Sequence, residues 1–162
     1  MELDETTKQL FACWYQIGKE NEDFLIRFFS FYLCLNVLMA RLSEKETDRE
    51  MICWVKRNGN ILDKAYRLAT RNHSFQKATK SLIDLCPVKA VGRQQNKELT
   101  MVDLNDFNSL VDVLYRIRCN LFHGKKNMMN ERDKRLIETA IPILDGWMEH
   151  IQSLINQNSH NS

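Results

Sequence analysis

The sequence predicts an all-α protein. Only five Gly and two Pro occur among its 162 residues, and 44% of the residues are hydrophobic, so long regular elements with few tight turns are expected. Apolar residues recur every three or four positions along most of the chain, which is the period of an amphipathic helix. We therefore expect an up-and-down bundle of about five or six helices. A single domain over residues 1–155 and a frayed polar tail over 156–162 are predicted.

Two helices are predicted in the first quarter of the chain. The first covers 5–17 and has its apolar residues on one face. The segment Asn21-Glu-Asp23 contains two carboxylates, which favour the start of the second helix because they complement the positive end of the helix dipole. The second helix, over 24–42, is apolar almost all round and should be central. Its most apolar part, 28–40, is shorter than the roughly 20 residues of a membrane span, so a core helix is expected.

The next segment contains a capped helix and a basic stripe. Thr47-Asp-Arg-Glu50 is a capping-box pattern that should begin a third helix. Residues 61–85 are also predicted as helical, with a break near Asn72. Lys64, Arg67 and Arg71 fall at i, i+3 and i+7 and form a stripe on one side of that segment. Both a solvated outer face and a track for RNA fit such a stripe.

The second half of the chain contains a long loop and two more helices. Residues 86–102 are predicted as a loop with a short extended piece at 88–91. Asp103 or Asn105 should cap a helix that continues to Gly124, since glycine often ends a helix in the left-handed conformation. Asn130 should cap the final helix.

Positive charge is concentrated in the middle of the chain. The net charge is only +2, but residues 64–126 contain 12 basic and 5 acidic side chains. A localised basic face suits a phosphate-bearing partner, and a solvated helix surface fits the same observation. The five cysteines and four histidines show no spacing typical of metal ligands. No metal, cofactor or disulfide framework is predicted, and without a basic, apolar leader a cytoplasmic protein is expected.

The most informative segment is 116–126, where polar residues end an apolar helix. Burying arginine, amide and imidazole groups beside apolar side chains costs free energy unless they are used. Arg116, Asn120 and His123 lie at i, i+4 and i+7 and share one face. Arg118 lies about 140° from His123 in a regular helix. These two residues meet only if the helix unwinds before His123 or if a second copy of the chain supplies one of them.

This segment resembles the motif of a known family. The grouping Arg-x-x-x-x-His, in the context Tyr-Arg-Ile-Arg-Cys-Asn-Leu-Phe-His-Gly-Lys over 115–125, is similar to that of the HEPN family (higher eukaryotes and prokaryotes nucleotide-binding domains). Many members are ribonucleases. The resemblance implies a metal-independent endoribonuclease that acts as a homodimer, with the motif residues converging across the subunit interface. It further implies a role in a toxin–antitoxin pair or in antiviral defence, with an antitoxin or other inhibitory partner protein.

The resemblance also implies roles for individual residues. It identifies Arg118 as the family arginine, whereas helical geometry favours Arg116, and both stay candidates. Metal-free RNA cleavage needs a base for the 2′-hydroxyl, cations for the charged phosphorane and an acid for the leaving oxygen. His123 can serve as base or acid, an arginine can supply the charge, and Asn120 can orient the phosphate. The expected RNA-binding residues are basic and belong to the middle third of the chain: Lys64, Arg67, Arg71, Lys125 and Lys126.

Two other interpretations remain open. Many active HEPN members carry a polar residue directly after the arginine, but Cys119 occupies that position here. A non-catalytic HEPN-like module that binds RNA, a nucleotide or a protein partner is therefore the main alternative. A helical interaction protein, with its arginines merely paired to acids such as Asp112, is the third.

Overall fold

The computed structural model describes residues 3–58, 60–89, 98–101, 103, 105–122 and 130–159. Within these ranges the protein is all-α, as predicted, and has seven helices. Two strands of two residues each, β1 (Val88–Lys89) and β2 (Glu98–Leu99), form one antiparallel pair. The helices are α1 (Glu5–Glu20), α2 (Phe24–Ser43), α3 (Asp48–Arg57), α4 (Ile61–Ala69), α5 (His73–Leu85), α6 (Phe107–Phe122) and α7 (Glu131–Ser159).

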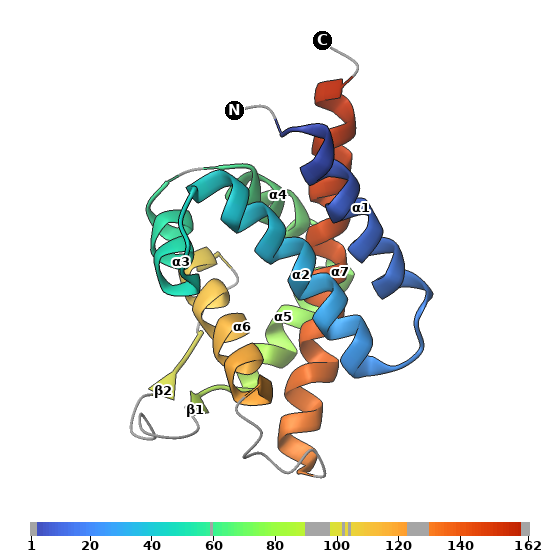
Figure 1. The fold of residues 1–162 in the computed structure, drawn as a ribbon. Helices are drawn as coiled ribbons and strands as arrows, with labels where there is room; N and C mark the ends of the chain where they lie inside the picture. Colours follow the sequence, from blue (N-terminus) through green and yellow to red (C-terminus); the bar gives the residue numbers. More distant parts are fainter. Residues whose placement is uncertain are drawn as a thin grey trace.

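The longest helix, α7, lies at the centre of the packing. It contacts α1, α2, α4, α5 and α6, while α3 packs against α2 and α6. Figure 1 shows α1 and α2 side by side along α7, with α3 and α6 on the other side of α2. The last turns of α6 therefore lie near the start of α7, away from the two chain ends.

An aromatic cluster forms the part of the core between α4, α6 and α7. The indole of Trp147 is fully buried and donates a hydrogen bond to the carbonyl oxygen of Leu62 at 2.9 Å. Its ring meets those of Tyr66 and Phe107 edge-on, with centroids 6.0 and 5.7 Å apart. Such tilted arrangements are the favoured geometry for aromatic pairs.

The structure has one helix more than the upper number expected, because the segment 61–85 forms two helices. α4 ends at Ala69, and the side chain of Asn72 then accepts hydrogen bonds from the backbone N–H groups of Ser74 and Phe75. Asparagine in this position satisfies N–H groups that lack a partner within the first helical turn. The predicted break near Asn72 is thus confirmed.

Most of the predicted helix caps are present. The Thr47 hydroxyl accepts from the Glu50 N–H at 3.3 Å, which is one half of a capping box. The same hydroxyl donates to the Glu50 carboxylate at 2.7 Å. Asn130 caps α7 by accepting from the Arg132 N–H at 2.9 Å. The prediction for α6 was wrong. Asp106 caps it through Ser109, because Asp103 instead accepts from the N–H of Asn105 in the preceding turn.

Two helices extend beyond the predicted ends. α1 continues through Gly18 to Glu20, and a Cβ atom at Gly18 would lie only 2.6 Å from Cε1 of Phe31 in α2. Gly18 therefore allows the two helices to approach closely and does not end the first one. At the other end of the chain, α7 continues past residue 155 to Ser159.

The apolar helix α2 is longer than its most apolar part, 28–40, whose length was compared above with that of a membrane span. It spans 20 residues with a mean hydropathy of 1.5, so its length and composition would allow it to cross a membrane. Among the described helices it alone meets both conditions. Core helices of soluble proteins meet them too, and half of α2 is buried within the structure. Phe28, Phe31 and Leu35 are at most 1% exposed, as the prediction of a core helix requires.

Candidate nucleic-acid site

The predicted catalytic residues that the structure describes lie on α6. Its apolar residues from Phe107 to Ile117 are buried, which fixes the helix against the core and leaves its last turns to carry the polar groups. Arg116, Arg118 and Asn120 all belong to those turns. Three other predicted site residues, His123, Lys125 and Lys126, lie outside the described residues.

Arg118 is held by two neighbours. Its Nη1 atom lies 2.9 Å from Oδ2 of Asp48, the first residue of α3, and both side chains are about 30% exposed (27% and 30%). The guanidinium carbon lies 4.6 Å from the ring centroid of Phe122, one turn further along α6. An ion pair and a cation–π contact together restrict a long side chain that would otherwise sample many rotamers. Arg118 thus has a defined position at the junction of α3 and α6.

The surroundings of Arg118 and of two neighbouring tyrosines determine which of these groups is charged. Burial lowers the pKa of Arg118, but Asp48, Cys119 and Tyr32 together raise it by more. The net pKa is therefore raised, and Arg118 stays charged. Burial raises the pKa of Tyr32 despite the opposing effect of Arg118. Burial and a hydrogen bond with Cys119 raise the pKa of Tyr115 to about 12. Both phenols are therefore neutral at physiological pH, and the cationic charge of the cluster belongs to Arg118.

Arg116 and Asn120 lie apart from Arg118. A rotation of 100° per residue sets each of them about 160° around α6 from Arg118. Asn120 is only 5% exposed and Arg116 is half-buried, and each has an interaction partner within the protein. Asn120 is therefore presented to the interior, where orienting a phosphate would require it to become accessible. The structure brings Arg118 together with Asp48 and does not bring it together with Arg116 or Asn120.

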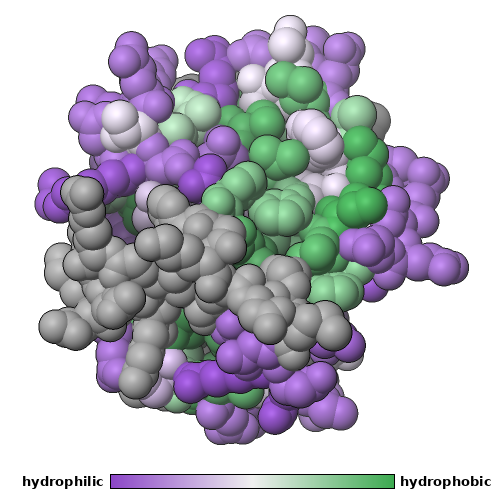
Figure 2. Space-filling view, turned by 60° about the horizontal axis from the view of Figure 1, so that its bottom comes forward, coloured by the Kyte–Doolittle hydropathy of each residue, from purple (hydrophilic) through white to green (hydrophobic). Residues whose placement is uncertain are grey.

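An exposed apolar face adjoins Arg118. Phe122 is 61% exposed and Ile26 is 45% exposed, values that are high for such large apolar side chains. Phe29 follows Ile26 by three residues on α2, and its ring contacts the ring of Phe122, with centroids 5.0 Å apart. We call Ile26, Phe29 and Phe122 the α2–α6 apolar face. Figure 2 shows apolar side chains gathered on this side of the molecule.

The predicted basic stripe lies at the opposite end of α6. Lys64 and Arg67 belong to α4, Arg71 follows it, and all three are exposed. Arg67 pairs through Nε with Oδ2 of Asp63 at 3.1 Å, so the acid just before the stripe partly neutralises it. Arg67 also lines a pocket with the first residues of α6. That pocket and Arg118 are separated by about ten residues of helix, or about 15 Å.

Sequence reasoning missed three polar residues on α3. Asp48 was noted only as part of a capping box, although its carboxylate also pairs with Arg118. Lys56 pairs with Asp112 of α6, and Arg57 lies beside it on the last turn of α3. Asp112, the acid considered above as a partner for the arginines of α6, thus pairs with Lys56 of α3. Asp48 and Lys56 are eight residues apart, which is about two helical turns. This spacing was the sequence feature from which they could have been predicted as neighbours of α6.

The comparisons with known proteins return no match: the chain matches no family model, no curated protein and no solved structure. Within the described ranges, no three His, Cys, Asp or Glu side chains are grouped as metal ligands would be. The function is therefore inferred from the residues described above and from the resemblance of the segment 115–125 to the HEPN motif.

Proposed function

We propose that the chain is a HEPN-like endoribonuclease that cleaves RNA without a metal ion and acts as a homodimer. The observation that carries this proposal is the position of Arg118. It is charged, held by Asp48 and Phe122, and located at the edge of an exposed apolar face on the last described turn of α6. His123 follows in the sequence directly after that turn. The up-and-down HEPN-like arrangement of the helices belongs to the same proposal.

The chemistry assigned to each residue follows from its charge and place. Arg118 is charged at every physiological pH and can stabilise the negative charge that develops on the phosphorane. His123 takes the proton of the 2′-hydroxyl or returns one to the leaving 5′-oxygen. Arg116 is the alternative cation, with six residues between it and His123. Lys125 and Lys126 are proposed to bind neighbouring phosphates.

A dimer would allow Arg118 and His123 to meet although one helix keeps them apart. A regular helix keeps the two about 140° apart, so one subunit would use the arginine of the other. The α2–α6 apolar face supports this proposal because exposed Phe and Ile side chains next to polar groups are typical of interfaces. A dimer formed through this face would bring two copies of Arg118 close to the same interface.

The biological setting follows from the proposed activity. A free endoribonuclease in the cytoplasm is toxic to the cell that makes it. We therefore propose a toxin or an antiviral effector, restrained by an antitoxin or another inhibitory partner protein.

The decisive test is cleavage of RNA by the purified protein in EDTA, beside His123→Ala, Arg118→Ala and Arg116→Ala. Cleavage should persist in the chelator and disappear in His123→Ala, because no other described or predicted group replaces the imidazole as base or acid. Arg118→Ala should lose at least about a hundredfold, as is typical for removal of one group that stabilises an oxyanion. Arg116→Ala is the comparison that ranks the two arginines. A larger loss in Arg116→Ala than in Arg118→Ala would reverse the assignment of the two arginines.

One observation favours the alternative of a non-catalytic HEPN-like binding module. The ion pair with Asp48 already satisfies one edge of the Arg118 guanidinium, and Cys119 follows it in place of a polar residue. If folded, dimeric wild-type protein binds several RNAs and cleaves none of them, the binding module becomes the better description.

A further inference from the structure

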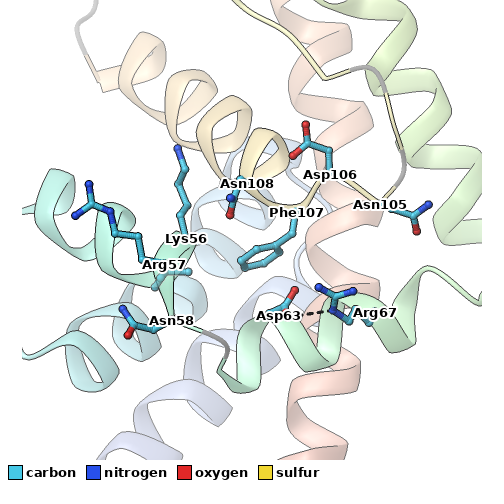
Figure 3. Close-up of a pocket in the computed structure, with 10 residues that line it drawn as sticks. Lys56, Arg57, Asn58, Asp63, Arg67, Asn105, Asp106, Phe107 and Asn108 are labelled. Atoms are coloured by element: carbon cyan, nitrogen blue, oxygen red, sulfur yellow. Dashed lines mark hydrogen bonds and ion pairs between the residues drawn. The ribbon is translucent and has the colours of Figure 1, made fainter.

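A polar pocket of about 240 Å³ opens where α3 ends, α4 begins and α6 begins. Figure 3 shows side chains from all three helices around it, with Lys56 and Arg57 extending from the last turn of α3. Asp63 and Arg67 of α4 form a second wall, and the residues that start α6 form the third. The amide-bearing residues of the lining are Asn58, Asn105 and Asn108.

The lining of the pocket carries three cations and two carboxylates. Asp63 pairs with Arg67, and the carboxylate of Asp106 is engaged by the N–H and hydroxyl of Ser109. Lys56 pairs with Asp112. Arg57 is exposed, and within the described residues it has no ion-pair partner. Arg57 is therefore the lining cation that is available to a ligand, and its planar set of donors matches the oxygens of a phosphate. The carboxylate of Asp106 keeps its negative charge, so a phosphate would bind on the Arg57 side of the pocket.

The first turn of α6 adds hydrogen-bonding groups to the pocket. Asn108 occupies that turn and is exposed, and the backbone N–H groups of a helix start carry a partial positive charge. Its side-chain amide offers both donors and an acceptor, as do those of Asn58 and Asn105. Such groups can hydrogen-bond the ribose or the base of a nucleotide whose phosphate pairs with Arg57.

The pocket and Arg118 lie at two ends of one line of contact between α3 and α6. At one end Asp48 of α3 pairs with Arg118, and further along Lys56 pairs with Asp112. The two helices therefore run in opposite directions, which brings the end of α3 to the beginning of α6. Asn108 is ten residues before Arg118, a rise of about 15 Å along α6.

We infer that this pocket binds a phosphodiester group of the single-stranded RNA whose cleavage is proposed above, at a point a few nucleotides away from the bond cleaved at Arg118. The inference rests on that proposed function for the identity of the ligand. A contact remote from the reacting phosphate positions the strand, and the energy of such contacts can be used in the reaction at the other end. A free nucleotide offers the same phosphate chemistry, and the experiment separates these two sources.

The experiment measures binding of a fluorescent single-stranded RNA of about 12 nucleotides, a length typical of single-strand sites. All proteins carry His123→Ala, so that RNA is not cleaved during the titration. Arg57→Gln is compared with Lys80→Gln, which removes the same charge from an exposed position on α5 outside the pocket. The expected result is about tenfold weaker binding for Arg57→Gln. The slope of log K against the logarithm of the salt concentration should also decrease in magnitude by about 0.7. Lys80→Gln should bind as the parent does.

Each other outcome overturns the inference in a distinguishable way. Weaker binding in Arg118→Ala but not in Arg57→Gln would leave the proposed nuclease standing and remove the pocket from it. Absence of RNA binding by the parent would overturn both the nuclease and the pocket. Binding of AMP that depends on Arg57, with no dependence for the RNA, would assign the pocket to a free nucleotide instead. Unchanged thermal unfolding of Arg57→Gln is the check on folding, since Arg57 is exposed.

Discussion

Arg118 shows how two modest contacts can fix one side chain. A surface ion pair alone contributes little, because solvent screens it and two long side chains lose freedom in forming it. Here Asp48 is short and starts α3, so little side-chain entropy is lost on its side of the pair. The ring of Phe122 then restricts the guanidinium from a second direction. In the proposed enzyme, this arrangement presents a cation that does not have to reorganise when the phosphorane forms.

Asp48→Asn tests whether this arrangement positions Arg118. We expect the free energy of unfolding to fall by about 1 kcal/mol or less, because the pair is partly exposed and the helix start loses a carboxylate. RNA cleavage should fall about tenfold to a hundredfold, since a misplaced catalytic group costs that much. Chemical denaturation and single-turnover cleavage provide the two measurements.

Asp145→Asn is the matched control for Asp48→Asn. Asp145 of α7 pairs with Lys19 of α1 at 3.1 Å, so the variant also breaks an ion pair between two helices, but far from Arg118 in the packing. It should lose a similar amount of stability and retain cleavage. Cleavage by Asp48→Asn at or above the wild-type rate would mean that Asp48 restrains Arg118 instead of positioning it.

At the scale of the helices, the sequence was informative wherever the determinant was local. The capping box at Thr47 and the caps at Asn72 and Asn130 each depend on residues within one helical turn, and all three are present. The start of α6 was misplaced because three acidic or amide residues precede it, and the choice of Asp106 depends on how the chain enters the helix. The predicted end of the first helix at residue 17 was too early, because the role of Gly18 depends on Phe31 of another helix.

Gly18→Ala tests the close approach of α1 and α2. Alanine favours helix over glycine by about 1 kcal/mol, but its Cβ would lie 2.6 Å from Cε1 of Phe31, which has no free space to move in a buried core. We expect a net destabilisation of about 1–3 kcal/mol, as for other overpacked cores. Thermal or chemical unfolding measures it.

Gly146→Ala in α7 is the comparison for that variant. Its Cβ would lie 3.2 Å from Cδ2 of Phe75, a contact that a shift of a few tenths of an ångström relieves. The gain in helix propensity should then offset most of the cost. Equal losses of stability in the two variants would show that the Phe31 contact does not explain the requirement for glycine at position 18.

At the scale of the whole molecule, the candidate site could be predicted only in part. The segment around Arg118 was recognisable because its residues are contiguous. The partner Asp48 lies 70 positions earlier, and no periodicity within one helix links the two. The pocket that contains Arg57 likewise forms only when the ends of three helices meet. The all-α class followed from composition, whereas the packing of α3 antiparallel to α6 did not.

Ile26→Glu tests the proposed homodimer. A carboxylate on the α2–α6 apolar face would have to be desolvated in the proposed interface, so the dimer should dissociate. Light scattering after gel filtration measures the mass, and cleavage should fall together with the dimer. Leu10→Glu is closely matched, because Leu10 on α1 is 46% exposed and Ile26 is 45% exposed. Dimers that survive Ile26→Glu, or a wild-type monomer at micromolar concentration, would contradict the composite site.

The central position of α7 sets the order in which the protein can mature during translation. α7 is the last described element, and five of the six preceding helices pack against it. Until its 29 residues have been added, those helices lack the surface that completes their core. At ordinary elongation rates this interval lasts about 1–6 s. The ribosome therefore synthesises the segment that carries Arg118 before the chain can fold around it. If the chain is the nuclease proposed above, its site can therefore form only after α7 has been made.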